Sequence, residues 1–266
     1  MARRSRQYLY LLPNSFTGLN MFLGLWAIML AVDGGRTQAR DAVVIASWWI
    51  VIASLMDGLD GAIARMTRTT SNFGVQFDSL SDLVTFGVAP AVILYSQIAQ
   101  WNPSVAVGVC AAFAIAGAVR LARFNISASP AAKKKVFQGL PIPAAAGLVV
   151  SLVLCIEHME KILGPEISRR VLPSAGLIAA YLMISKMRFL SFRDMAFREV
   201  ATPAWVAFQL LIFIVFMVWI LMLEDLRDVL ALVIFGGYVL HSITAALVWR
   251  WKLVVRRGEA ANGAER

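Results

Sequence analysis

Residues 54–68 read SLMDGLDGAIARMTR, and residues 71–87 read SNFGVQFDSLSDLVTFG. Each stretch places carboxylates at helical spacing within an otherwise apolar run. The carboxylates belong to Asp57, Asp60, Asp78 and Asp82. At about 100° per residue, the first two share one helix face and the last two share one face of the next helix. A polar loop of about eight residues joins the helices, so we expect antiparallel neighbours whose acidic faces meet.

Apolar residues continue on both sides of these stretches and dominate the chain. Of its 266 residues, 59% are hydrophobic and 15% are charged, whereas an ordinary soluble domain has roughly 25% charged residues. The mean hydropathy is +0.71, and a soluble protein of this size cannot bury so much apolar surface in one core. This composition excludes an ordinary soluble enzyme and a disordered chain, and it predicts an integral membrane protein.

Eight apolar runs have about the 20 residues that an α-helix needs to cross a bilayer. They are residues 9–32, 42–64, 75–99, 103–122, 141–158, 171–186, 204–223 and 229–249. With both termini in the cytoplasm, 19 of the 25 lysines and arginines lie on the cytoplasmic side, in agreement with the positive-inside rule. The sequence therefore predicts an all-α polytopic membrane bundle, in a bacterial inner or plasma membrane. We attribute the net charge of +9 to cytoplasmic loops and anionic lipid, not to nucleic-acid binding.

The four aspartates are costly residues for a membrane helix. One aspartate at the centre of a span costs on the order of 3 kcal/mol, so four facing lipid would cost about 10 kcal/mol or more. They must face a polar cavity or a counter-ion, and such residues are functional by default. Converging carboxylates repel each other, and one or two divalent cations relieve that repulsion. Ligands that are all oxygen favour Mg²⁺, Mn²⁺ or Ca²⁺ over Zn²⁺.

Written as a pattern, the two stretches give Asp57-x2-Asp60-Gly61-x2-Ala64-Arg65-x8-Gly74-x3-Asp78-x3-Asp82. This pattern resembles the complete signature of the CDP-alcohol phosphotransferases, integral membrane enzymes that move a phosphatidyl group from a CDP-linked lipid to an alcohol. The resemblance implies a six-helix catalytic core, which we place at residues 1–200. Residues 201–252 would then add two transmembrane helices, and residues 253–266 would form a cytoplasmic tail.

The resemblance also implies a role for each position of the signature. Two ions, Mg²⁺ or Mn²⁺, would be held by the four aspartates, with Asp57 and Asp78 bridging both, Asp60 completing one site and Asp82 the other. Asp82 would also be the general base that takes the proton of the alcohol. The donor CDP-diacylglycerol would be held through its cytidine diphosphate by Asp57, Gly61, Arg65, Ser71 and Gly74. In the first span, Asn14 and Thr17 share a face and are expected to contact the nucleotide, with helix–helix hydrogen bonding as their alternative role.

A second polar cluster, RLARFNIS at residues 120–127, closes the fourth predicted span, and FQGLPIPAAAG follows at residues 137–147. Both strings resemble the branch of the family that uses L-serine and releases CMP. The serine carboxylate would be bound by Arg120 and Arg123, because an arginine fork is a natural carboxylate receptor. Asn125 is expected to add a hydrogen bond. The alternative for the two arginines is anchoring at the cytoplasmic interface.

Other functions stay open at this point. Another member of the family would use glycerol phosphate, inositol phosphate or choline, and charge alone does not decide between these acceptors. A cation transporter would also carry intramembrane carboxylates, but we expect such a path to place acids near the midplane and on both sides. Membrane lipid is an expected partner, and association into a homodimer is left open.

Overall fold

The computed structural model describes residues 2–67, 72–128, 139–187, 228–241 and 243–244. Within these ranges the chain is helical and contains no strand, which confirms the predicted all-α class. The elements in order are α1 (Ala2–Thr37), α2 (Arg40–Thr67), α3 (Asn72–Asp82), the π-helical segment η1 (Leu83–Val88), α4 (Ala89–Ile98), α5 (Pro103–Ala128), α6 (Ile142–Leu163) and α7 (Glu166–Ile184). A shorter apolar helix follows at Asp228–His241.

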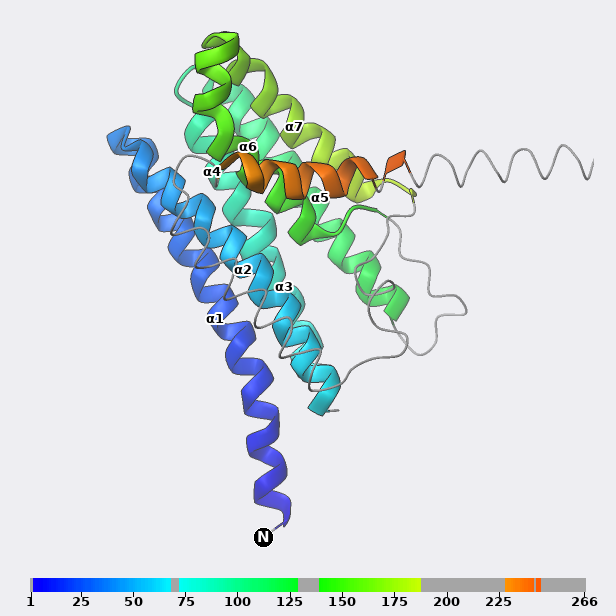
Figure 1. The fold of residues 1–266 in the computed structure, drawn as a ribbon. Helices are drawn as coiled ribbons and strands as arrows, with labels where there is room; N and C mark the ends of the chain where they lie inside the picture. The colour runs from blue at the N-terminus through cyan, green and yellow to red at the C-terminus, as the bar shows by residue number, and fades with distance from the viewer. Residues whose placement is uncertain (1, 68–71, 129–138, 188–227, 242, 245–266) are drawn as a thin grey trace, which may run out of the picture.

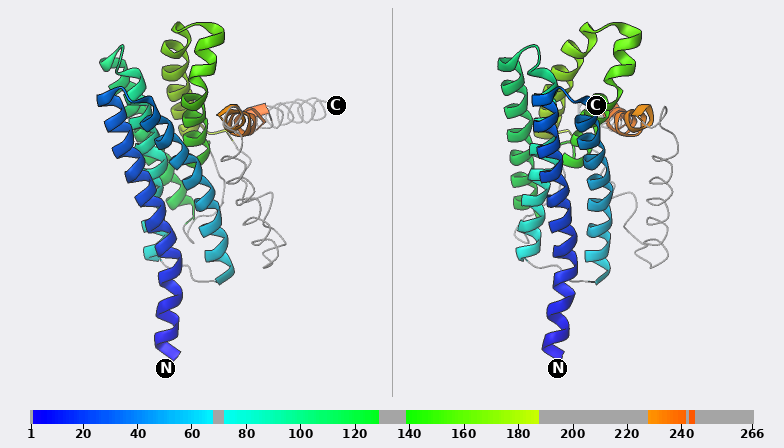
Figure 2. Two further views of the ribbon diagram at one scale, coloured as in Figure 1. Left: turned by 60° about the vertical axis from the view of Figure 1, so that its left-hand side comes forward. Right: turned by 90° about the vertical axis from the view of Figure 1, so that its left-hand side faces the viewer.

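The helices form an elongated bundle. α1 and α2 pack as a long antiparallel pair, and the N-terminal end of α1 extends beyond the other helices (Figure 1). The segment η1 joins α3 and α4 into one continuous rod, in which the Ala89 amide donates to the Val84 carbonyl five residues back. α5 returns along η1 and α4, and α6 and α7 form the next hairpin (Figure 2). The Asp228–His241 helix crosses the bundle at a steep angle (Figure 1).

Five of the described helical stretches are long and apolar enough to cross a membrane. They are Asn14–Thr37, Phe73–Ile98, Pro103–Ile126, Ile142–Leu163 and Glu166–Ile184. They match five of the predicted spans, and the second predicted span falls within α2. The count of eight is not confirmed, because residues 204–223 lie outside the described ranges and Asp228–His241 is a shorter helix.

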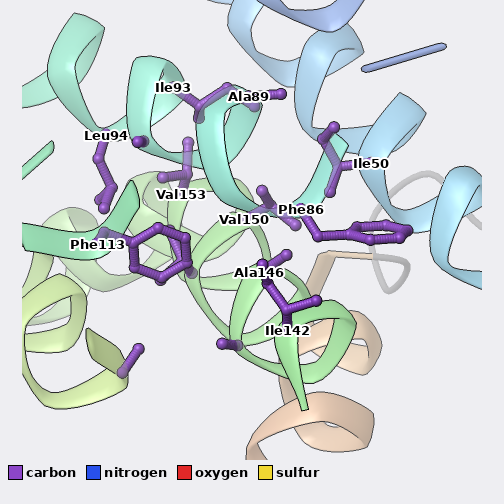
Figure 3. Packing of buried hydrophobic residues seen from close by; sticks show 14 of the residues in the cluster. Ile50, Phe86, Ala89, Ile93, Leu94, Phe113, Ile142, Ala146, Val150 and Val153 are labelled. Carbon is purple, nitrogen blue, oxygen red and sulfur yellow. The ribbon is translucent and has the colours of Figure 1, made fainter. Parts of the chain in front are cut away.

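The apolar core lies where η1 and α4 meet α5 and α6 (Figure 3). Phe86, Ile93, Phe113 and Ile142 are fully buried there. Between lipid-exposed helices, association depends on close van der Waals packing, which small residues permit. The core accordingly includes alanines, among them Ala146 in Figure 3. This packing fixes the rod formed by α3, η1 and α4, and so it fixes the direction of the aspartates on α3.

α1 crosses the rod at a point where only glycine fits. A Cβ added to Gly24 would lie 2.7 Å from the Thr85 Cα. Beside this crossing, the Ser81 hydroxyl donates to the Thr17 carbonyl and the Thr85 hydroxyl donates to the Asn20 carbonyl, each at 3.0 Å. The backbones of α1 and the rod are therefore in close contact, and α1 is held in place next to the acidic end of α3.

Candidate metal and active site

Three of the four signature aspartates converge. Asp57 comes from α2, and Asp78 and Asp82 come from successive turns of α3. One carboxylate oxygen from each of the three lies within 4.8 Å of the other two, and all three residues are half-buried. The sequence prediction that the acidic faces of two consecutive helices meet is therefore confirmed for these residues.

The geometry of this cluster fits a cation. Oxygen ligands bond Mg²⁺ or Ca²⁺ at 2.0–2.6 Å, so ligands of one ion lie no more than roughly 5 Å apart. Three carboxylates this close repel each other strongly unless a positive charge lies between them. A donor set made of carboxylates alone suits Mg²⁺ or Mn²⁺ and not a softer metal. Asp57, Asp78 and Asp82 are thus residues that can hold a divalent ion.

The remaining signature residues are only partly described. Asp60, Gly61 and Arg65 lie in the last turns of α2, but their side chains fall outside the described part of the structure. Ser71 lies in the gap before α3. Gly74 is half-buried in the first turn of α3, one turn before Asp78. The expected second metal site and most of the nucleotide cradle therefore remain predictions.

Three polar residues, Asn14, Thr17 and Asn20, follow one another at three-residue spacing on α1. Asn14 is half-buried and Thr17 is buried. Asn20, one turn further, is 1% exposed. Its side-chain oxygen accepts no hydrogen bond from the residues that the structure describes. The predicted site did not include Asn20, although its three-residue spacing from Thr17 within an apolar helix was a usable signal.

The C-terminal end of α5 is tied to α3 by side chains. The Asn125 amide nitrogen donates to the Ser79 hydroxyl at 3.0 Å, and the Ser79 oxygen lies 3.1 Å from the Asn125 oxygen. Ser79 directly follows Asp78 in the chain. The structure therefore connects Asn125 to the helix that carries Asp78 and Asp82, and its contact there is Ser79.

The two arginines of α5 have different surroundings. The Arg120 guanidinium lies over the Phe124 ring, 5.5 Å from its centroid. Arg123 is exposed, and its guanidinium donates to the Ile184 carbonyl at the end of α7 at 2.8 Å. The contact of Arg123 is a helix C-terminus 61 residues away, where a cation is favoured by the unpaired carbonyls.

The segment before α6 passes close to the same end of α7. The Gly139 amide donates to the Met187 carbonyl at 2.9 Å, and the Leu140 amide donates to the Leu182 carbonyl at 3.0 Å. Gly139 has a φ of +87°, and a Cβ there would overlap the Met183 carbonyl oxygen. The part of the FQGLPIP string that the structure describes is thus a tight backbone crossing, and glycine is required for it.

Comparison with known proteins shows the family to which this chain belongs. The family model of the CDP-alcohol phosphatidyltransferases matches residues 10–179, which contain every signature position. The chain belongs to the CDP-alcohol phosphatidyltransferase family. The resemblance seen in the signature is therefore confirmed, and Asp57, Asp78 and Asp82 are the signature aspartates whose side chains the structure describes.

Within this family, the chain is similar to proteins named CDP-diacylglycerol–serine O-phosphatidyltransferase. One from Helicobacter pylori is 36% identical over 95% of this chain and 98% of its own length. One from Saccharomyces cerevisiae is 35% identical over 53% of this chain and 52% of its own length. One from Methanocaldococcus jannaschii is 44% identical over 41% of this chain and 51% of its own length.

Proposed function

We propose that this chain transfers the phosphatidyl group of CDP-diacylglycerol to the hydroxyl of L-serine, giving phosphatidylserine and CMP. The observation that carries the proposal is the likeness to the Helicobacter pylori protein of that name along nearly the whole of both chains. The convergent carboxylates of α2 and α3 supply the acidic centre that the reaction needs. The proposed activity is that of a CDP-diacylglycerol–serine O-phosphatidyltransferase.

The reaction is a displacement at phosphorus. The serine hydroxyl oxygen attacks the phosphorus that carries the diacylglycerol, a new phosphorus–oxygen bond forms, and the bond to the CMP oxygen breaks. We assign Asp82 as the general base that accepts the hydroxyl proton. Together with Asp57, Asp60 and Asp78, it would hold two Mg²⁺ or Mn²⁺ ions. Bound divalent ions neutralise the pyrophosphate charge and orient the reacting groups.

The donor nucleotide is assigned to the side of the site formed by α1, the end of α2 and the start of α3. Gly61, Arg65, Ser71 and Gly74 would cradle the cytidine diphosphate, as the signature implies. Asn14 and Thr17 would complete it from α1. The contacts that support this assignment are the hydroxyl of Ser81 on the Thr17 carbonyl and the half-buried position of Gly74.

The acceptor is assigned to the side of the site formed by the end of α5. The support for this assignment is the hydrogen bond of Asn125 to Ser79, the residue that follows Asp78 on α3. Of the two arginines, Arg120 is the stronger candidate for the serine carboxylate, because it is half-buried, whereas Arg123 is exposed and its guanidinium donates to the end of α7. A bidentate arginine contact recognises the carboxylate, which is the group that distinguishes serine from a simple amino alcohol.

The membrane arrangement follows from the same assignments. The protein is an integral membrane protein by its five apolar spans and its family. We propose that the acidic end of the bundle faces the cytoplasm of a bacterial cell, with both termini on that side, so that serine and CMP exchange with water. The acyl chains of the donor stay in lipid. Residues 1–200 would form the catalytic core, residues 201–252 two further helices, and self-association into a homodimer is compatible with this layout.

The test is release of CMP from CDP-diacylglycerol by the purified protein in detergent with Mg²⁺ or Mn²⁺. We expect release that depends on L-serine and formation of phosphatidylserine. Ethanolamine, which lacks the carboxylate, should be a poor acceptor. Glycerol phosphate, inositol phosphate and choline are the comparison alcohols, and preferred use of any of them would overturn the assignment of serine.

A further inference from the structure

Ser79 is a polar residue of α3 that no assignment above uses. It lies between the two acidic residues of α3, directly after Asp78, and it is half-buried. Its hydroxyl oxygen lies 3.0 Å from the Asn125 side-chain nitrogen and 3.1 Å from the Asn125 side-chain oxygen. It also lies 3.1 Å from the Val75 carbonyl, one turn earlier in the same helix.

The rest of α5 gives this contact its significance. α5 packs along α7 and along the η1 and α4 part of the rod. Ser79 and Asn125, 46 residues apart, bridge the two helices at the end where Arg120 and Asp78 also lie. A side-chain hydrogen bond therefore links the helix that holds the acidic cluster to the helix end that we assign to the acceptor.

The Ser79 hydroxyl has two acceptors within reach, the Asn125 carboxamide oxygen and the Val75 carbonyl. A serine hydroxyl has a single proton to donate, so it cannot donate to Val75 and to Asn125 at once. When the hydroxyl donates to Val75, it accepts from the Asn125 amide nitrogen, and all three groups are satisfied. The Asn125 carboxamide is then held in one orientation, and its oxygen is not taken up by the Ser79 proton. A carboxamide oxygen so placed is an acceptor suited to an ammonium group.

We propose that Ser79 is a positioning residue for the acceptor: it holds the Asn125 carboxamide against the acidic helix, so that an acceptor carrying an ammonium group is aligned with the cluster of Asp57, Asp78 and Asp82. This inference rests on the proposed function, because L-serine is an acceptor with an ammonium group. Ser79 itself touches neither donor nor acceptor in this scheme. It acts through Asn125, and its loss should change recognition of the acceptor and not of the CDP-lipid.

The experiment is steady-state kinetics of CMP release for four variants: Ser79→Ala, Asn125→Ala, the double variant and Ser79→Thr. Loss of one neutral hydrogen bond should raise the KM for serine roughly 2- to 12-fold in each single alanine variant. The KM for CDP-diacylglycerol should stay within about twofold of the unmodified protein. The KM for serine of the double variant should be no higher than that of the more impaired single variant, because the two side chains act as one unit. Ser79→Thr keeps the hydroxyl and should restore most of the serine KM.

Ser54→Ala is the matched control. Ser54 is also half-buried, donates to a carbonyl one turn back at 3.0 Å, and lies one turn from an aspartate of the cluster, Asp57. It should leave the serine KM unchanged. Effects of Ser79→Ala and Asn125→Ala that simply add, or an equal rise in both KM values, would overturn the proposal. If Ser79→Ala does not fold in detergent, Asn125→Ala and Ser79→Thr still give the KM comparison. If the unmodified protein prefers another alcohol, the proposed function fails, and the same variants measured with that alcohol decide the role of Ser79.

Discussion

The two sides of the acidic cluster are built differently. On the α1 side, Gly24 brings backbone against the rod at Thr85, and two hydroxyl groups donate directly to α1 carbonyls. On the α5 side, the contact with α3 runs through the side chains of Ser79 and Asn125. Backbone packing leaves α1 little room to shift, whereas the contact between α5 and α3 depends on one pair of side chains. This difference suits a donor that is always CDP-linked and an acceptor that must be selected among alcohols.

The largest expected effect lies at the cluster that both sides share. Asp78→Asn removes one of the three clustered carboxylate charges without changing side-chain size, and it should lower CMP release more than about 100-fold, because the divalent ions that this carboxylate is proposed to hold would neutralise the pyrophosphate charge. EDTA should abolish activity in the unmodified protein, and added Mg²⁺ or Mn²⁺ should restore it. Thermal unfolding in detergent is the control for folding. Full activity in chelator would contradict a metal centre.

The acceptor side is tested by a pair of substitutions on one helix. Arg120→Lys keeps the charge and removes the bidentate fork. Loss of a charge-assisted contact costs about 1.5–3 kcal/mol, so the KM for serine should rise roughly 10- to 150-fold with little change for CDP-diacylglycerol. Arg123→Lys is the matched comparison, since Arg123 is engaged at Ile184, and it should leave the serine KM nearly unchanged. A larger rise in the serine KM for Arg123→Lys than for Arg120→Lys would make Arg123 the residue that binds the carboxylate and Arg120 the anchor at the membrane interface.

The donor side is tested by stability. Gly24→Ala forces a methyl group against the Thr85 backbone, and overpacking of this kind costs about 1–3 kcal/mol. We expect a lower midpoint of thermal unfolding in detergent and a raised KM for CDP-diacylglycerol, because α1 must move away from Thr85. Gly18→Ala on the same helix is the control, since a Cβ there meets nothing within 4 Å. Equal midpoints for the two variants would show that the α1 contact is not tight.

Much of the site was predictable because its cause is local. The spacing of Asp78 and Asp82 sets a common face on any helix, and a short loop from the helix of Asp57 makes the two faces neighbours. The all-α membrane class followed from composition for the same reason: the length and apolarity of each run are properties of that run alone.

What sequence reasoning missed depends on contacts between distant segments. The partner of Arg123 is the backbone carbonyl of Ile184, and the identity of residue 184 gives no sign of this contact. Ser79 is an ordinary serine in sequence and becomes notable only when α5 brings Asn125 to it. The burial of Asn20 depends on the crossing of α1 over the rod. These are tertiary contacts, and they cannot be predicted from helical periodicity.

The π-helical segment Leu83–Val88 bears on where the chain tolerates changes of length. A π-turn holds one residue more than an α-turn within about one full rotation, whereas one residue of regular α-helix corresponds to about 100° around the axis. Deleting a single residue from η1 would therefore leave a regular α-helix in which the acidic pair, Asp78 and Asp82, keeps nearly the same direction relative to the buried face of α4 with Ile93 and Leu94. Deleting a single residue from the regular turn of α4 before Ile93 would instead rotate the carboxylates by about 100° relative to that face. The rod should thus tolerate the loss of one residue in η1 better than the loss of one residue in the turn that follows it.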